Sequence, residues 1–162
     1  MGQRQGNREN RERGNSKEHA YFYSTIATGG VFLPKSEIDI TPGTGTDDQV
    51  EPGWRIAVRA AQEKQATDIK ILDLTGVTSF TDYFVICTGA NTRQTQAIVD
   101  EVGLQLKKRG ELPNAVEGYE QGEWVLSDYG DFLVHVFSVK AREYYSLERL
   151  WRDAKDVPLP AE

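Results

Sequence analysis

Residues 124–137 read WVLSDYGDFLVHVF, two apolar runs on either side of a turn sequence at Asp128–Asp131. Both runs are rich in Val, Leu and aromatic residues, which favour extended backbone, and the turn combines Asp with Gly. The pattern predicts a β-hairpin with strands at 124–127 and 132–139. A third extended segment, 116–119, is expected just before it.

The residues upstream of this hairpin predict two more strands and two helices. The continuous apolar run Tyr83–Cys87 is typical of a central strand that is covered on both faces, and 69–74 predicts a second strand. A first helix is expected after the turn at 51–53, and Thr67 and Asp68 should stop it. A second helix should begin at the N-cap Asn91 and end at the basic stop signal 107–110.

Downstream of the hairpin, residues 140–155 predict one closing helix. Its apolar side chains would share a face, namely Tyr144, Leu147 and Trp151. Glu148 and Arg152 have the spacing of a helical ion pair. Only one long helix joins extended runs as a crossover, so the order of elements predicts an α/β (α+β) fold, a mixed sheet of about five strands with helices packed on it.

The first 50 residues differ from the rest in composition. They hold scattered apolar residues among Gly, Asn, Thr, Pro and charges, too few to offset the entropy cost of folding. We expect residues 1–50 to be a disordered or non-native N-terminal extension, 51–155 to form the folded domain and 156–162 to be a C-terminal tail. Nothing resembles a signal peptide or a membrane span, which predicts a cytoplasmic protein with no membrane partner.

Charge and cysteine content narrow the range of functions and bonds that the chain can have. The chain has a net charge of −6, and residues 51–162 carry 13 basic against 18 acidic side chains. Direct binding of nucleic acid is therefore not expected as the main activity, because it needs a basic footprint. The single cysteine, Cys87, lies in an apolar run, which excludes an internal disulfide and predicts a buried core thiol.

No set of reactive side chains predicts an enzyme, a cofactor or a metal site. The two histidines, His19 and His135, have no recognisable nucleophile or acid as partner, and Asp128 with Asp131 offers too few oxygens for a hard cation. The turn at 88–91 joins a strand to a helix N-terminus, where a phosphate could rest on backbone amides. It lacks the glycine spacing of known phosphate loops, so geometry alone also explains Gly89.

An acidic run is the other unusual feature. Between residues 111 and 131 there is no Lys or Arg, and there are six carboxylates: Glu111, Glu117, Glu120, Glu123, Asp128 and Asp131. Tyr119, Trp124 and Tyr129 are interleaved with them. One interpretation is an interface with aromatic anchors and an acidic rim for a basic partner. The other is a solvated hairpin whose aromatic side chains turn inward.

Several motifs in one order carry a family resemblance: DIKILDL (68–74), TDYFVICTG (81–89), VEG (116–118), the hairpin at 124–137, REYY (142–145) and LERLW (147–151). In these the chain, from about Trp54 to Trp151, resembles the ribosomal silencing factor (Iojap) family. The resemblance implies a nucleotidyltransferase-like fold without its catalytic carboxylates, since Asp100 and Glu101 are adjacent in a helix and point about 100° apart. Residues 51–155 would then be a ribosomal silencing factor domain.

The resemblance also implies a function. Family members bind large ribosomal subunit protein fourteen on the 50S subunit, block association of the small and large subunits, and damp translation under nutrient limitation. The positions of this chain that match the family's docking residues are Trp124, Leu126, Asp128, Tyr129 and Asp131. On this hypothesis Trp124→Glu abolishes binding and leaves the fold intact. The sequence leaves open a homodimer, and its alternative function is a nucleotide-binding or nucleotidyltransferase enzyme using the Gly89 turn.

Overall fold

The computed structural model describes residues 50–161, so the extension expected at 1–50 lies outside the described residues except for Val50. The described part contains one six-stranded sheet and four helices. The strands are β1 (Thr67–Asp73), β2 (Tyr83–Gly89), β3 (Ala115–Glu117), β4 (Trp124–Asp128), β5 (Phe132–Ser138) and β6 (Lys155–Val157). The helices are α2 (Gly53–Glu63), α3 (Thr92–Lys107), α4 (Val139–Tyr145) and α5 (Leu147–Leu150).

The sheet has the strand order β3-β4-β5-β2-β1-β6. Only β2 and β5 run parallel, and all other neighbours are antiparallel. β2 has β5 and β1 as neighbours, and all of its residues after Tyr83 are buried, as its continuous apolar sequence predicts. The expectations of a mixed sheet, a central β2 and a β4–β5 hairpin are confirmed.

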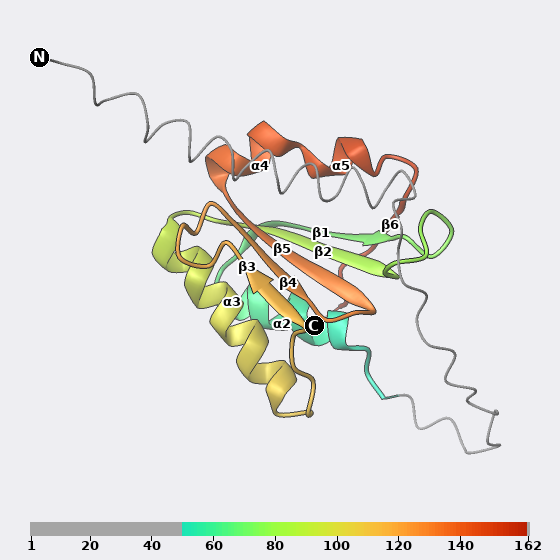
Figure 1. The fold of residues 1–162 in the computed structure, drawn as a ribbon, viewed down its shortest axis with the longest axis horizontal. Coiled ribbons are helices and arrows are strands. Elements are labelled where there is room, and N and C mark those ends of the chain that lie inside the picture. The colour runs from blue at the N-terminus through green and yellow to red at the C-terminus, as the bar shows by residue number, and fades with distance from the viewer. Residues whose placement is uncertain (1–49, 162) are drawn as a thin grey trace, which may run out of the picture. The chain divides into compact units, whose positions relative to one another are not determined.

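The two faces of the sheet are covered by different helices (Figure 1). On one face α2 and α3 pack over an aliphatic core to which the sheet contributes Val85, Val125 and Val134. On the other face, beneath α4 and α5, the core is aromatic and includes Phe84, His135, Phe137, Trp124 and Trp151. Because side chains alternate along a strand, neighbouring residues of β4 enter opposite cores.

Local sequence sets the helix boundaries. The side chain of Asn91 accepts a hydrogen bond from the backbone N–H of Gln94, which caps α3 as predicted. The Gln94 side chain donates in turn to the carbonyls of Lys64 and Gln65, beyond the C-terminus of α2. One glutamine therefore ties the end of α2 to the start of α3, and a carbonyl-rich helix end gains polar partners.

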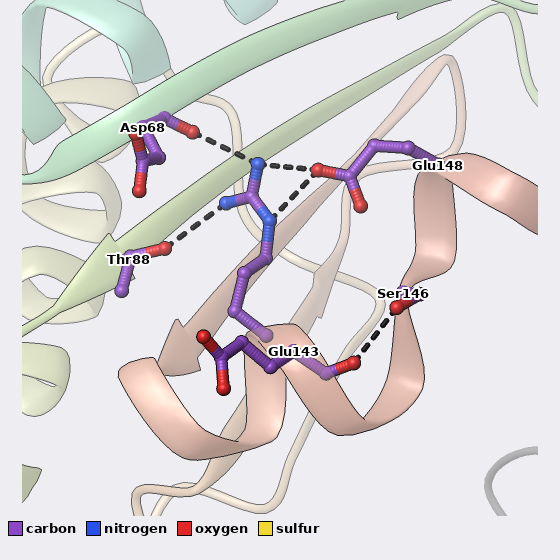
Figure 2. Close-up of polar contacts among 6 residues, drawn as sticks. Asp68, Thr88, Glu143, Ser146 and Glu148 are labelled. Carbon is purple, nitrogen blue, oxygen red and sulfur yellow. Dashed lines mark hydrogen bonds and ion pairs between the residues drawn. The ribbon is translucent and has the colours of Figure 1, made fainter.

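The prediction of one closing helix over 140–155 is wrong. α4 ends at Ser146, which has left-handed backbone with φ of 44°, and the chain continues as the single turn α5. The hydroxyl of Ser146 donates to the carbonyl of Glu143, so the side chain competes with the helix for backbone groups (Figure 2). Tyr144 is 76% exposed, away from the face of the buried Leu147.

Residues 155–157 form β6 instead of the end of a helix. β6 pairs antiparallel with β1, with Val157 opposite Ile71, and so adds a sixth strand to the sheet where about five were expected. It also crosses the expected boundary between the domain and the C-terminal tail at residue 155. Three residues followed by Pro158 are too short for a period-two pattern to identify a strand.

Candidate protein-docking surface

The indole of Trp124, the first residue of β4, lies in the aromatic core. It is 8% exposed, and its Nε1–H donates to Nδ1 of His135 at 3.1 Å. Its ring stacks on Phe137 at 5.0 Å and contacts Tyr145 at 4.7 Å between centroids. Trp124 is therefore part of the domain core, and the expectation that Trp124→Glu leaves the fold intact is inconsistent with these contacts.

His135 is the polar centre of this core. Because Nδ1 accepts the indole hydrogen bond, it carries no proton, so the neutral ring is protonated at Nε2. Burial, with a smaller contribution from the charge of Arg142, lowers the pKa of His135 to about 3. The histidine therefore stays neutral at physiological pH and acts as a structural acceptor for Trp124.

The register of β3 and β4 decides which further predicted docking residues share a face with Trp124. Leu126 and Asp128 follow it at two-residue intervals, and Leu126 lies opposite Glu117 of β3 and His135 of β5. Leu126 is buried with 4% exposure, whereas Asp128 is half-buried and accepts a hydrogen bond from the backbone N–H of Gly130. Trp124, Leu126 and Asp128 thus form one row on the α4–α5 face.

Tyr129 belongs to the opposite face. Its ring stacks on Phe132 at 5.0 Å with an interplanar angle of 10°, and it packs against the aliphatic core. Burial, together with the nearby carboxylate of Glu111, raises its pKa to about 12. The structure therefore does not bring the five predicted docking residues together on one face, because Tyr129 turns toward α3 and away from the row on β4.

Most carboxylates of the acidic run are exposed, while its three aromatic side chains are buried or half-buried. Tyr119 donates its hydroxyl hydrogen to Asp100 at 2.8–2.9 Å and so connects the loop before β4 to α3. The same hydrogen bond raises the pKa of the Tyr119 phenol. Glu117, Glu120, Glu123 and Asp131 are exposed. Of the two interpretations of the run, the inward aromatics describe the fold, and what remains at the surface is an acidic rim.

The Gly89 turn has few backbone groups to offer a phosphate. The N–H of Ala90 donates to Oε1 of Gln94 at 2.6 Å, and that of Gln94 donates to Asn91. A Cβ at Gly89 would come within 2.7 Å of Thr95, so close packing against α3 accounts for the glycine. These contacts argue against using the turn as a nucleotide site.

Asp100 and Glu101 have separate partners, as expected for adjacent helical residues. Asp100 accepts from Tyr119, while Glu101 accepts from Gln105 and lies 3.8 Å from the ammonium of Lys64. Within residues 50–161, no group of three or more His, Cys, Asp or Glu side chains could hold a metal ion. In the same residues, none of the helices has the length and apolarity needed to cross a bilayer.

A largely buried arginine, Arg142, which sequence reasoning missed, connects α4 and α5 to the sheet. Arg142 is 11% exposed at its side chain and forms an ion pair with Glu148 at 2.5 Å in place of the predicted pair between Glu148 and Arg152. It also donates to the hydroxyl of Thr88 at 3.1 Å and to the carbonyl of Asp68 at 3.0 Å (Figure 2). The guanidinium therefore joins α4 and α5 to the ends of β1 and β2.

Comparison with known proteins identifies the family. Residues 47–162 match the family model "Ribosomal silencing factor during starvation". The chain belongs to the ribosomal silencing factor family. The ribosomal silencing factor of Bacillus subtilis is 44% identical over 100 residues, covering 62% of this chain and 85% of the relative. That of Halalkalibacterium halodurans is 42% identical over 105 residues, covering 65% and 90%.

Ribosomal silencing factor relatives also share the fold. A crystal structure of a Chromobacterium violaceum protein aligns with a TM-score of 0.61 and 34% sequence identity, covering 68% of this chain and 91% of that protein. A mouse protein named for mitochondrial assembly of the ribosomal large subunit is 32% identical over 97 residues, or 42% of its own length. The resemblance expected from the motifs is confirmed, and a ribosomal silencing role follows from the family.

Proposed function

We propose that this ribosomal silencing factor binds large ribosomal subunit protein fourteen on the 50S subunit and blocks association of the small and large subunits. Translation would thereby be damped under nutrient limitation, in the cytoplasm and without catalysis. The observation that carries the proposal is the exposed acidic rim in and before the β4–β5 hairpin, in a chain that belongs to this family. The rim consists of Glu117, Glu120, Glu123 and Asp131. A rim of one charge sign favours a basic protein partner and disfavours bare RNA.

The five docking residues predicted from the family have different parts in this proposal. Asp128 and Asp131, at the β4–β5 turn, would contact the partner directly, and the half-buried Tyr129 would fix this turn through its stacking on Phe132. Trp124 and Leu126 are covered by their own chain, so their part is to hold β4 in place beneath the rim. Charge at the rim would act mainly on the association rate.

The test is a charge reversal at the rim. We expect Asp131→Lys to slow association with purified large ribosomal subunit protein fourteen severalfold at low salt, with less effect at high salt, as measured by biolayer interferometry. Asp153→Lys is the matched control, because Asp153 is also an exposed aspartate and lies far along the chain, between α5 and β6.

The consequence for ribosomes is measured separately, by light scattering of mixed small and large subunits. The wild-type protein should reduce the formation of joined ribosomes, and Asp131→Lys should require a higher concentration for the same reduction. Undiminished subunit joining at saturating wild-type protein, or no binding to the isolated ribosomal protein, would overturn the proposal.

A further inference from the structure

α4 carries two exposed apolar side chains, Val139 and Tyr144, which are five residues apart and so point about 140° apart around the helix. Val139 is 55% exposed and Tyr144 is 76% exposed, although both belong to a helix that covers an aromatic core. A tyrosine left this open gains little for the stability of its own domain. Tyrosine is also enriched among the residues that dominate binding energy at protein interfaces.

Tyr144 is connected to the core by a continuous series of ring contacts. The series runs from Phe137 to Trp124 at 5.0 Å, from Trp124 to Tyr145 at 4.7 Å and from Tyr145 to Tyr144 at 5.0 Å between centroids. The last pair meets edge to face at 87°, a favourable geometry for two aromatic rings. The buried Trp124 therefore helps to position an exposed aromatic ring at the surface.

The backbone beneath Tyr144 is also held firmly. Arg142, two residues earlier, is fixed by its ion pair with Glu148 and by hydrogen bonds to Thr88 and Asp68 (Figure 2). At the N-terminus of α4, the Ser138 hydroxyl accepts a hydrogen bond from the N–H of Ala141. An exposed side chain on a backbone that is already ordered loses less conformational freedom on binding.

The acidic rim reaches the start of this helix. The hydroxyl of Ser138 donates to the carboxylate of Glu123 at 2.8 Å, which brings the last carboxylate before β4 next to Val139. On α4 itself, Glu143 is exposed beside Tyr144, and Lys140 is a cation on the same helix. Because Arg142 turns inward to Glu148, these exposed charges sum to two carboxylates against one ammonium, and a net negative surface complements a basic protein partner.

We propose that Tyr144 is the aromatic anchor of the docking surface that the buried Trp124 cannot be, and that Glu143 beside it and Glu123 at the start of α4 supply negative charge for a basic partner. The occupant is the basic ribosomal protein of the proposed function, on which this inference rests. Arg142 is a positioning residue for the anchor. The docking surface then extends from the β4–β5 hairpin onto α4.

Truncation of the anchor tests this directly. Tyr144→Ala should weaken binding to purified large ribosomal subunit protein fourteen by about thirtyfold, the effect of losing a central aromatic anchor, mostly through faster dissociation. Leu104→Ala is the control, because Leu104 is 51% exposed on α3. Thermal unfolding of both variants should match the wild type, since exposed side chains contribute little to stability.

Comparison with Asp131→Lys separates the two proposals. If Asp131→Lys slows association and Tyr144→Ala binds like the wild type, the α4 anchor is overturned and the proposed function stands. If the wild-type protein does not bind the purified ribosomal protein, the proposed function and the α4 anchor are both overturned. Sedimentation velocity addresses a second copy of this chain as occupant: a Tyr144→Ala variant that loses self-association and keeps full affinity for the ribosomal protein would overturn the inference.

Discussion

Trp124 offers a sharp test of the division between core and docking surface. Its indole is 8% exposed, contacts three neighbouring rings and donates a 3.1 Å hydrogen bond to His135. Trp124→Ala removes all of these contacts, whereas Trp124→Phe keeps an aromatic ring and removes the hydrogen bond. The two variants therefore separate the contribution of packing from that of the polar contact.

The expected magnitudes follow from burial. Truncating a buried tryptophan to alanine typically costs about 3–5 kcal/mol of unfolding free energy, and one hydrogen bond contributes about 1 kcal/mol. We therefore expect losses of about 4 kcal/mol for Trp124→Ala and about 1–2 kcal/mol for Trp124→Phe. Because domains have only about 5–15 kcal/mol to lose, Trp124→Glu, which also buries a charge, should unfold the domain.

The assay is equilibrium unfolding in urea followed by far-UV circular dichroism, with stability taken from the midpoint and the slope. Tyr144→Ala is the control, because it removes an aromatic ring from the exposed end of the same series of contacts and should change the free energy by less than about 0.5 kcal/mol. A Trp124→Ala protein as stable as the wild type would refute the assignment of Trp124 to the core. It would also restore Trp124 as an accessible docking residue.

Three further predictions concern buried polar groups. Arg142→Ala should destabilise the domain by about 3 kcal/mol in urea unfolding, and Glu148→Gln should cost much less once Arg142 is absent, because the two side chains form one partly buried pair. For His135, with a folded pKa of about 3 against about 6.5 when unfolded, the unfolded chain binds the extra proton between these values. Stability should therefore fall by about 1.4 kcal/mol per unit as pH drops below 6.5, and His135→Gln should flatten this slope. Burial raises the pKa of Cys87 to about 12, so its thiol should react with Ellman's reagent only at the rate of unfolding, and rapid reaction in native buffer would contradict this.

The elements that could be predicted from sequence are those whose determinants are local. The cap at Asn91 and the continuous apolar run of β2 each lie within a few residues, and both were confirmed. The prediction of one closing helix was wrong because Ser146 breaks it with a left-handed backbone and a hydroxyl bonded to the carbonyl of Glu143, and because the two pieces are then held by distant partners. Arg142 bonds Thr88 and Asp68, and no periodicity in residues 140–155 records that contact. The strand β6 likewise exists through its pairing with β1.

The docking residues were harder to place than the strands that carry them. A strand of alternating residues between two cores has no solvent face, so the pattern of β4 predicts extension without telling which side chains a partner can reach. Tyr129 lies beyond the last residue of β4, and its stacking on Phe132 turns it toward the other core. The family resemblance pointed to this segment, and its residues differ in burial: Trp124 and Leu126 are buried, Asp128 and Tyr129 are half-buried and Asp131 is exposed.

This division of tasks explains why aromatic residues and carboxylates are interleaved in one segment. A strand near the sheet edge must be held by its own core before it can present charges in a fixed arrangement, and the inward rings of Tyr119 and Trp124 do so. The carboxylates between them are then displayed on an ordered backbone, at little further entropy cost on binding. If docking also needs an aromatic anchor, it must come from another element, and Tyr144 on α4 is the exposed ring in direct contact with this packing.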